Sequence, residues 1–261
     1  MNSFEILPGD QASNIIIHVP HGGTIIPEDV RRDIVLADDD LTREIKLMAD
    51  SATDEIARDV YRRAQIKPWI FINNFSRLVI DPERFPDERE EMNTVGMGAV
   101  YTKTSDQKTL RLPDSHRDQL LISEYFAPYT AALSSLTTEV LTNHKKVHIL
   151  DLHSYAVEAL PYEIHQVSQR PALCIGIDSF HTSQTLIDNC RAAFASVSSI
   201  EIDQPFVGTY VPMEHYKEDA RVKSLMLELR KDTYAYGDKK SPQYQDIVLA
   251  CVDLLNRIEA A

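Results

Sequence analysis

The sequence of 261 residues lacks long apolar runs, has few cysteines, and has fewer basic than acidic residues. No stretch approaches the roughly 20 apolar residues that a membrane-spanning helix needs, so we expect no membrane span. The first twenty residues contain no basic head followed by an apolar block, so we expect no signal peptide. The three cysteines, Cys174, Cys190 and Cys251, lie far apart and form no Cys-x-x-Cys motif. These features exclude a disulfide framework and a thiolate metal site, and they favour buried, reduced thiols in a cytoplasmic protein.

Positive charge is also scarce. The chain has 27 basic and 40 acidic residues and a formal net charge of −13. Such a surface repels nucleic acid and anionic lipid, so the expected partner is a small molecule. An acidic substrate would need a local cluster of arginines. The 43% of hydrophobic residues is ordinary for a packed core, and the length fits one α/β domain over residues 1–261. The sequence does not indicate an oligomeric state.

Strand and helix patterns alternate along the chain. Apolar β-type runs predict strands at 15–19, 68–72, 147–152, 172–177 and 223–229. Helical patterns follow at 41–63, 118–143, 183–195 and 244–258. This alternation predicts a mainly parallel sheet that is covered by helices on both faces.

Residues 73–114 differ from the rest of the chain. They combine prolines and glycines with a dense charge run at Asp87–Glu91, and they have little periodicity. A long irregular segment inside a compact domain is usually disordered or functional. Because apolar and aromatic residues such as Phe85 and Tyr101 run through it, we expect a substrate-binding insertion.

Two histidines follow apolar strands where turns begin. His21 comes after 15–19 and precedes two glycines, and His153 comes after 147–152. Open α/β sheets bind ligands at the carboxyl ends of their strands. Most histidines after strands are structural, and we interpret His18 in that way. His21 and His153, however, together suit a metal site built from distant parts of the chain.

A third ligand has to come from elsewhere. Catalytic zinc commonly takes three protein ligands, often histidines with a carboxylate, and leaves one position for water. The helix predicted over 41–63 would place Asp50 and Asp54 one turn apart on a shared face. We predict Asp50 as the third ligand, with Asp54 as its partner or solvated. The alternative for either residue is an acid on the helix surface.

Glu228 is the candidate general base. It lies within an apolar strand, where a carboxylate is costly to bury unless it is paired or functional. Hydrolysis by metal-bound water needs a group that takes the proton and returns it. The alternative role is an ion pair with a neighbouring arginine.

Four arginines could bind a substrate carboxylate. Arg77, Arg84 and Arg111 lie in or beside the irregular segment, and Arg230 lies near Glu228. Guanidinium groups bind carboxylates bidentately, so this concentration predicts a carboxylate pocket. Alternatively, Arg77 and Arg84 pair with acids of the same segment, namely Asp81, Glu83 or Asp87.

An ordered set of motifs resembles the N-formylglutamate amidohydrolase family. The elements are His18–Gly23, Asp50–Asp54, Ser76–Pro86, Gly96–Tyr101, Asp151–Tyr155, Pro205–Pro212 and Leu227–Arg230. Each is weak alone, but they occur in that family's order and span most of the chain. The Asp151–Tyr155 element also resembles the zinc-ligand turn of metallocarboxypeptidases.

The resemblance implies a three-layer α/β/α sandwich with a mixed, mainly parallel sheet, similar to zinc carboxypeptidases. It implies zinc ligation by His21 and His153, a general base at Glu228, and motif arginines at Arg77, Arg84 and Arg230. Thr24 stands where carboxypeptidases have a carboxylate three residues after the first histidine, so Asp50 would replace that ligand. Asp203 stands where the family usually has asparagine, which bears on the exact substrate.

We therefore expect a zinc-dependent hydrolase that cleaves the amide of an N-acyl, and more narrowly an N-formyl, acidic amino acid such as N-formylglutamate. One alternative is a metallocarboxypeptidase-like peptidase that acts on a small or cell-wall peptide. Another is a non-catalytic binding protein that keeps the fold without zinc. The sequence does not distinguish zinc from iron or manganese, because metal selectivity depends on geometry and supply.

Overall fold

The computed structural model describes residues 2–164, 166–167, 169–237 and 239–260. Its strands are β1 (Phe4–Leu7), β2 (Ile15–Val19), β3 (Trp69–Asn73), β4 (Val147–Tyr155), β5 (Leu173–Gly176), β6 (Ile200–Ile202), β7 (Val222–Arg230), β8 (Ala235–Tyr236) and β9 (Lys239–Lys240). Its α-helices are α1 (Glu28–Arg31), α2 (Asp38–Met48), α3 (Thr53–Arg63), α4 (Ser115–Leu121), α5 (Ala127–Asn143), α6 (Gln184–Ala193) and α7 (Tyr244–Glu259). Two 3₁₀ turns, η1 (Glu91–Val95) and η3 (Lys231–Thr233), and a π-helical turn, η2 (Ile122–Phe126), complete the elements.

Seven strands form the main sheet, in the order β1-β3-β2-β4-β7-β5-β6. The central strands β3, β2, β4 and β7 run parallel to one another. β1 is antiparallel to β3, and β5 is antiparallel to β7. This confirms the predicted mixed, mainly parallel sheet. The carboxyl ends of the four central strands meet at one edge, which is where such sheets bind ligands.

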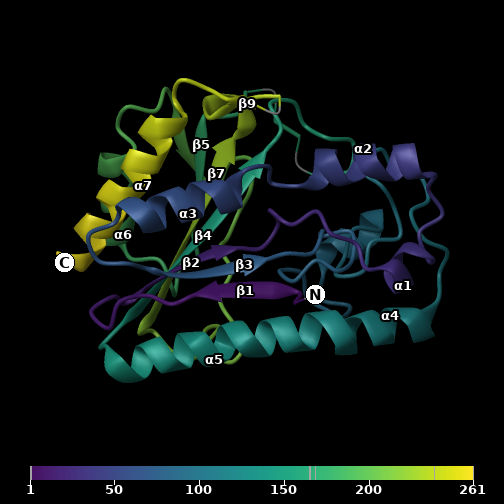
Figure 1. Cartoon of the computed structure of the whole chain (residues 1–261), viewed down its shortest axis with the longest axis horizontal. Coiled ribbons are helices and arrows are strands. Elements are labelled where there is room, and N and C mark those ends of the chain that lie inside the picture. The colour runs from purple at the N-terminus through teal and green to yellow at the C-terminus, as the bar shows by residue number, and fades with distance from the viewer. Residues whose placement is uncertain (1, 165, 168, 238, 261) are drawn as a thin grey trace.

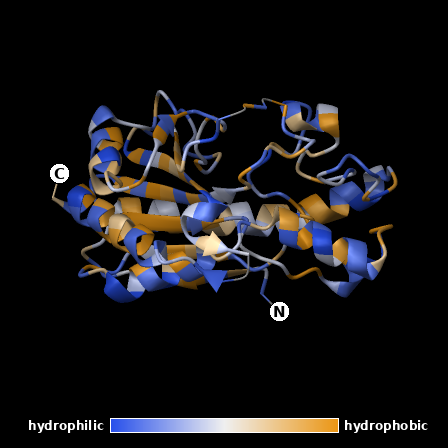
Figure 2. Cartoon of the chain, turned by 90° about the horizontal axis from the view of Figure 1, so that it is seen from above, coloured by the Kyte–Doolittle hydropathy of each residue, from blue (hydrophilic) through white to orange (hydrophobic). Residues whose placement is uncertain are grey.

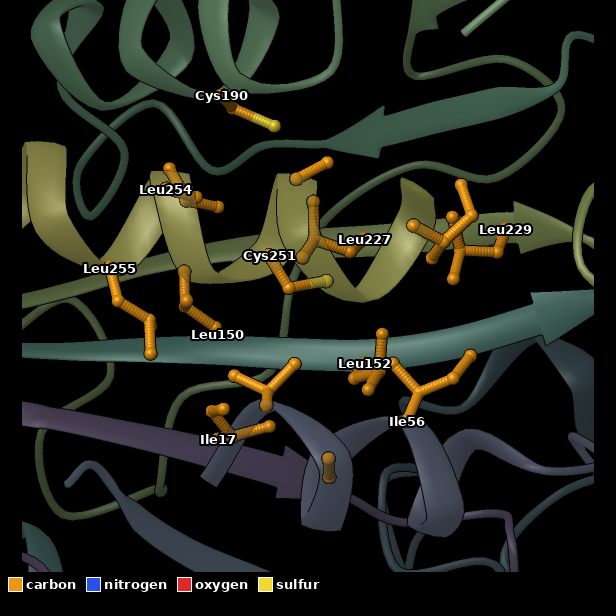
Figure 3. Packing of buried hydrophobic residues seen from close by; sticks show 14 of the residues in the cluster. Ile17, Ile56, Leu150, Leu152, Cys190, Leu227, Leu229, Cys251, Leu254 and Leu255 are labelled. Carbon is orange, nitrogen blue, oxygen red and sulfur yellow. The ribbon is translucent and has the colours of Figure 1, made fainter. Parts of the chain in front are cut away.

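Helices cover both faces of the sheet (Figure 1). α3, α6 and α7 lie over one face, and α5 lies over the other. Along β4, Leu150 and Leu152 enter the first core, whereas Ile149 enters the second. Figure 3 shows Leu150 and Leu152 among the side chains of the first core. Burial of each such leucine contributes roughly 1.5–3 kcal/mol. The three-layer α/β/α arrangement is confirmed.

The hydrophobic pattern of each element explains these layers. Strand residues alternate between the two cores and are buried on both faces, so the strands are apolar over most of their length. The helices bury one face only. Figure 2 shows this contrast, with mostly hydrophobic strands in the middle and mixed helices around them.

The predicted helix over 41–63 is interrupted, which corrects the prediction of one continuous helix. α2 ends at Met48 and α3 begins at Thr53. Between them, Ala52 has a left-handed backbone conformation with φ of 63°, which a right-handed helix cannot contain. The backbone N–H of Asp50 donates to the carbonyl of His21 at 3.0 Å. Asp50 therefore lies in a break beside the end of β2, and not one turn from Asp54 on a helix face.

The remaining long elements were predicted within a few residues. β4 continues to Tyr155, so His153 lies inside the strand. The helix predicted over 118–143 is formed by α4, η2 and α5 in succession. β1 and β6 were not predicted. None of the described helices is both long and apolar enough to cross a membrane.

In the fully described stretch between β3 and α4, η1 is the one helical element. The stretch is nevertheless packed. Leu78, Met97, Tyr101 and Leu110 are buried with residues of α2, and Val79 and Ile80 are buried with Phe126. These two small clusters fix the irregular segment against α2 and the start of α5.

Candidate active site

The candidate site lies at the carboxyl edge of the parallel strands. His21 follows β2, His153 lies in β4, and Glu228 lies in β7 directly beside His153 in the parallel register. Their exposed fractions are 3%, 3% and 8%. All three line one cavity of about 680 Å³. The sheet therefore brings together the two imidazoles and the carboxylate that the sequence analysis singled out.

Three donor atoms converge on one point. The Nδ1 atoms of His21 and His153 lie 3.2 Å apart, and Asp50 Oδ2 lies 3.1 Å from Nδ1 of His153 and 3.8 Å from Nδ1 of His21. An ion about 2.0–2.1 Å from each tetrahedral ligand requires ligand atoms roughly 3.3 Å apart. The Ser154 backbone N–H also donates to Asp50 Oδ2 at 3.1 Å, which fixes the carboxylate in place. These residues fit a divalent metal ion.

The far side of each imidazole faces a carboxylate. Nε2 of His21 lies 2.9 Å from Asp81 Oδ1, and Nε2 of His153 lies 3.2 Å from Asp151 Oδ1. The hydrogen bond to Asp81 favours a proton on Nε2 of His21 and leaves its Nδ1 free to bind a metal. Nε2 of His153 makes no aligned hydrogen bond to a described residue, so Asp151 acts on that ring through its charge. Sequence analysis identified neither carboxylate as a partner of an imidazole. The spacing of two between Asp151 and His153 in one strand was an available signal, since such residues point to the same face.

Asp151 is itself held by buried groups. Nδ1 of His18 lies 2.9 Å from Asp151 Oδ1, and Nε2 of His18 lies 2.6 Å from the hydroxyl of Tyr129. The Tyr210 backbone N–H donates to Asp151 Oδ2 at 3.1 Å. His18 is fully buried, and in this chain it orients the partner of His153.

The two imidazoles differ electrostatically. Burial, with the charge of Arg77, lowers the pKa of His21 to about 4, so this ring is neutral near pH 7. Burial would also lower the pKa of His153, but the charges of Glu83 and Asp151 outweigh it and raise that pKa well above its usual range. Binding of a metal at both Nδ1 atoms would therefore be opposed by acid, because a ligand nitrogen must be deprotonated.

Glu83 offers a second arrangement of ligands. One of its oxygens lies within 4.8 Å of donor atoms of His21 and His153, and the same holds for His18 and Asp151. Its Oε2 is 3.2 Å from Nε2 of His153. Burial, with the charge of Asp151, raises the pKa of Glu83 to about 7. We favour Asp50 as the ligand, because Glu83 lies on the Nε2 side of the rings. The sequence analysis considered Glu83 only as an ion-pair partner.

Glu228 has an unpaired carboxylate oxygen. No described residue donates a hydrogen bond to its buried Oε2. Burial raises the pKa of this carboxyl to about 8. The neighbouring Arg230 donates instead to Asp232 and to the carbonyl of Arg170, so the ion pair considered as an alternative for Glu228 is not formed there. A carboxylate that faces a cavity without a partner is suited to proton transfer.

Arg77 and Arg84 line the cavity. Arg77 donates to Asp81 Oδ2 through Nη2 at 2.7 Å and through Nε at 3.2 Å. Burial would raise the pKa of Asp81, but the charge of Arg77 outweighs it and holds that pKa well below its usual range. Arg84 lies 3.7 Å from Asp81 and 3.8 Å from Glu90, and its buried Nε has no partner among the described residues. Arg84 is therefore less tightly paired with protein carboxylates than Arg77.

The other two predicted arginines do not reach the cavity. Arg111 is 1% exposed and donates to the backbone carbonyls of Tyr101 and Leu78. Arg230 is held by Asp232. Neither is among the described residues that line the cavity, so neither is placed to contact a substrate there. Two cations that were not predicted, Arg89 and Lys231, do line it.

Comparison with known proteins agrees with this geometry. The family model described as N-formylglutamate amidohydrolase matches residues 13–235. The structure of an N-formylglutamate amidohydrolase from Ralstonia eutropha JMP134 is 20% identical, with a TM-score of 0.82 over 100% of this chain and 98% of that chain. A gene product from Agrobacterium tumefaciens is 16% identical, with a TM-score of 0.70 over 100% of this chain and 96% of that chain. At these identities the two structures show a shared fold.

A metallo-carboxypeptidase from Pseudomonas aeruginosa is more distant. It is 11% identical, with a TM-score of 0.36 over 94% of this chain and 56% of that chain. The sequence has no significant match among curated proteins. Because the family match extends over residues 13–235, the chain belongs to the N-formylglutamate amidohydrolase family and is a hydrolase.

Proposed function

We propose that this protein is a zinc-dependent hydrolase of the amide bond in an N-acyl amino acid, with N-formylglutamate as the reference substrate. The observation that supports this most directly is the convergence of His21 Nδ1, His153 Nδ1 and Asp50 Oδ2 in a cavity that also contains the unpaired carboxylate of Glu228. Family membership supports the reaction type.

His21, His153 and Asp50 would hold the metal. When bound, the ion polarises the acyl carbonyl and lowers the pKa of water. Asp81 orients His21 through the hydrogen bond at its Nε2, and the carboxylate of Asp151 places a negative charge 3.2 Å from Nε2 of His153. These two carboxylates thus support metal binding without contact with the substrate.

Glu228 serves as the general base and acid. Its carboxylate takes a proton from the attacking water and returns it to the nitrogen of the leaving amine. Its place beside His153 in the register of β4 and β7 keeps it next to the ligand set. Without metal, the pKa of about 8 keeps the Glu228 carboxyl largely protonated near pH 7. A nearby cation would favour its charged form.

The segment 73–114 supplies substrate orientation. Arg84 is the candidate for binding a substrate carboxylate, because it lines the cavity and its nearest acids lie beyond hydrogen-bonding distance. Arg77 is fixed by Asp81 and contributes positive charge near the reacting group. The three free cysteines are buried, which supports the proposed location in a reducing cytoplasm.

Metal content and formate release test this proposal together. The purified protein should contain about one zinc per chain by elemental analysis and should release formate from N-formyl-L-glutamate. A dipeptide assay, run in parallel, detects the alternative peptidase activity. Glu228→Gln should keep the metal and lose the activity. A protein that retains no metal after zinc loading would contradict the proposal and favour a non-catalytic role.

A further inference from the structure

We propose that the substrate carries a single carboxylate and a sizeable apolar group, and that Leu47, Ile164, Val207 and Met213 form an apolar subsite for that group. This inference rests on the proposed function and narrows its substrate. It departs from N-formylglutamate, which has two carboxylates and only a formyl group.

Four exposed apolar residues line the cavity. Leu47, Ile164, Val207 and Met213 all line the cavity, and their exposed fractions are 41%, 43%, 71% and 43%. Exposed hydrophobic residues that are scattered over a surface need no explanation, whereas a cluster around a cavity indicates ligand binding. Because these residues face both the cavity and solvent, they lie at its mouth. Phe206, which also lines the cavity, packs edge-on against Tyr155 at 5.5 Å between ring centroids.

The cavity is also larger than the reference substrate requires. Its volume of about 680 Å³ lies within the range of pockets for drug-sized ligands. N-formylglutamate has roughly a dozen non-hydrogen atoms, which is well below that size. A substrate with a longer acyl group or a larger apolar side chain would use the remaining volume and cover the apolar mouth.

The charges of the cavity oppose a substrate with two carboxylates. Among the described residues that line it are seven Asp and Glu residues but only four Arg and Lys residues. Glu163 is neutralised by Arg170, at 2.5 Å between Oε2 and Nη1. Six acidic and four basic lining residues then remain, so a bound divalent ion would bring their net charge to zero. Each substrate carboxylate therefore adds a net negative charge to the cavity, so one carboxylate is accommodated more readily than two.

The four lining cations are not equally available to a substrate. Arg77 is held by Asp81, and Arg89 is held by Asp87 at 2.6 Å and is largely exposed. Lys231 donates through Nζ to the carbonyl of Ala49 at 2.7 Å. Arg84 remains as the one lining guanidinium of the described chain whose nearest carboxylates lie beyond hydrogen-bonding distance. One such group matches one substrate carboxylate.

Either end of the substrate can supply the apolar group, and a set of four substrates distinguishes these sources. They are N-formyl-L-glutamate, N-formyl-L-leucine, N-octanoyl-L-glutamate and N-octanoyl-L-leucine, assayed with the zinc-loaded enzyme. We expect kcat/KM to be at least about tenfold higher for N-octanoyl-L-leucine than for N-formyl-L-glutamate. If N-formyl-L-leucine reaches the same value, the side chain occupies the subsite. If it does not, the acyl group does. A highest kcat/KM for N-formyl-L-glutamate would overturn the inference and leave the proposed function intact.

Variants test whether these residues form the subsite. Val207→Asn and Met213→Asn should each lower the ratio of kcat/KM for N-octanoyl-L-leucine to that for N-formyl-L-glutamate by about tenfold. Leu112→Asn is the matched control, since Leu112 is 64% exposed and is not among the described lining residues. An unchanged ratio in both test variants would overturn the assignment of the subsite.

A failure of the proposed function gives a different result. In that case none of the four substrates is hydrolysed by the zinc-treated protein, and the subsite is judged from binding alone. Calorimetry should then show that N-octanoyl-L-leucine binds more tightly than N-formyl-L-glutamate, and that Val207→Asn weakens only this preference. Equal binding of the two compounds would overturn the inference.

Discussion

The two walls of the candidate site are built in different ways. On one wall, β2, β4 and β7 deliver His21, His153 and Glu228 from a hydrogen-bonded sheet over an apolar core. On the other wall, the irregular segment delivers Asp81 and Arg84, which are held mainly by polar side chains. Strand register determines positions on the first wall. On the second wall each position depends on several polar partners, so one substitution there displaces several groups.

Removal of the metal should give the largest effect, because the groups of both walls act on a reaction that the ion promotes. Chelation, or the variant His153→Ala, should lower kcat/KM by more than about a thousandfold, since the proposed ion supplies both carbonyl polarisation and acidic water. Zinc should restore the chelated enzyme but not the variant. Full activity of a protein shown by elemental analysis to be free of metal would contradict the proposed mechanism.

Glu228→Gln tests the sheet wall alone. We expect kcat/KM to fall by about two to four orders of magnitude, because proton transfer is lost while the shape is kept. Metal content should remain near that of the unsubstituted protein. If activity and metal are lost together, Glu228 supports the metal site and is not the base.

The choice between Asp50 and Glu83 compares the walls directly, because Asp50 is fixed by the sheet and Glu83 belongs to the irregular segment. Asp50→Ala should weaken zinc binding by more than about a hundredfold, whereas Glu83→Gln should weaken it far less. Competition with a chromogenic chelator measures both affinities. The opposite order would assign the ligand role to Glu83.

Asp81→Asn and Asp151→Asn should give smaller effects on the metal, of about 10- to 100-fold in affinity. Asp81→Asn should have the larger effect on stability, because it also leaves the buried guanidinium of Arg77 without its anion. Thermal unfolding separates this loss from the change in metal affinity. Equal destabilisation by both variants would show that the two walls respond alike.

The smallest expected effect is the pH dependence of the stability of the metal-free protein. The pKa of Glu228 is raised from its ordinary value near 4.5 to about 8 in the folded chain, chiefly by burial. The folded state therefore binds the proton more tightly than the unfolded state, and stability falls as pH rises through this window. Glu228→Gln should remove that dependence, so its stability advantage should be small at pH 4 and should grow toward pH 8. Parallel unfolding profiles of the two proteins would contradict the burial of a charge at this position.

The sequence predicted the sheet wall better than the segment wall. The strands and Glu228 follow from short, nearly continuous apolar runs, which are a local signal. Asp50 was proposed as a ligand on a helix face, but it lies in a break that no glycine or proline marks. Asp81 and Glu83 were missed as partners of the imidazoles because their roles depend on contacts across 60 or more positions of sequence. Asp151, two residues from His153 in one strand, could have been found from that spacing. Arg111 was predicted to bind a substrate, but it donates to backbone carbonyls. Every residue has such a carbonyl, so the sequence could not reveal this structural role.

The interruption at Ala52 has a consequence for changes in chain length. Each helical residue turns the chain by about 100°, so one residue inserted between Met48 and Thr53 must be absorbed at one of two places. Either the carboxylate of Asp50 leaves the Ser154 amide, or the apolar stripe of α3 rotates off the sheet. Connections between helices usually accept insertions, but contacts at both ends fix the length of this one. We expect this connection to tolerate substitutions far better than insertions or deletions.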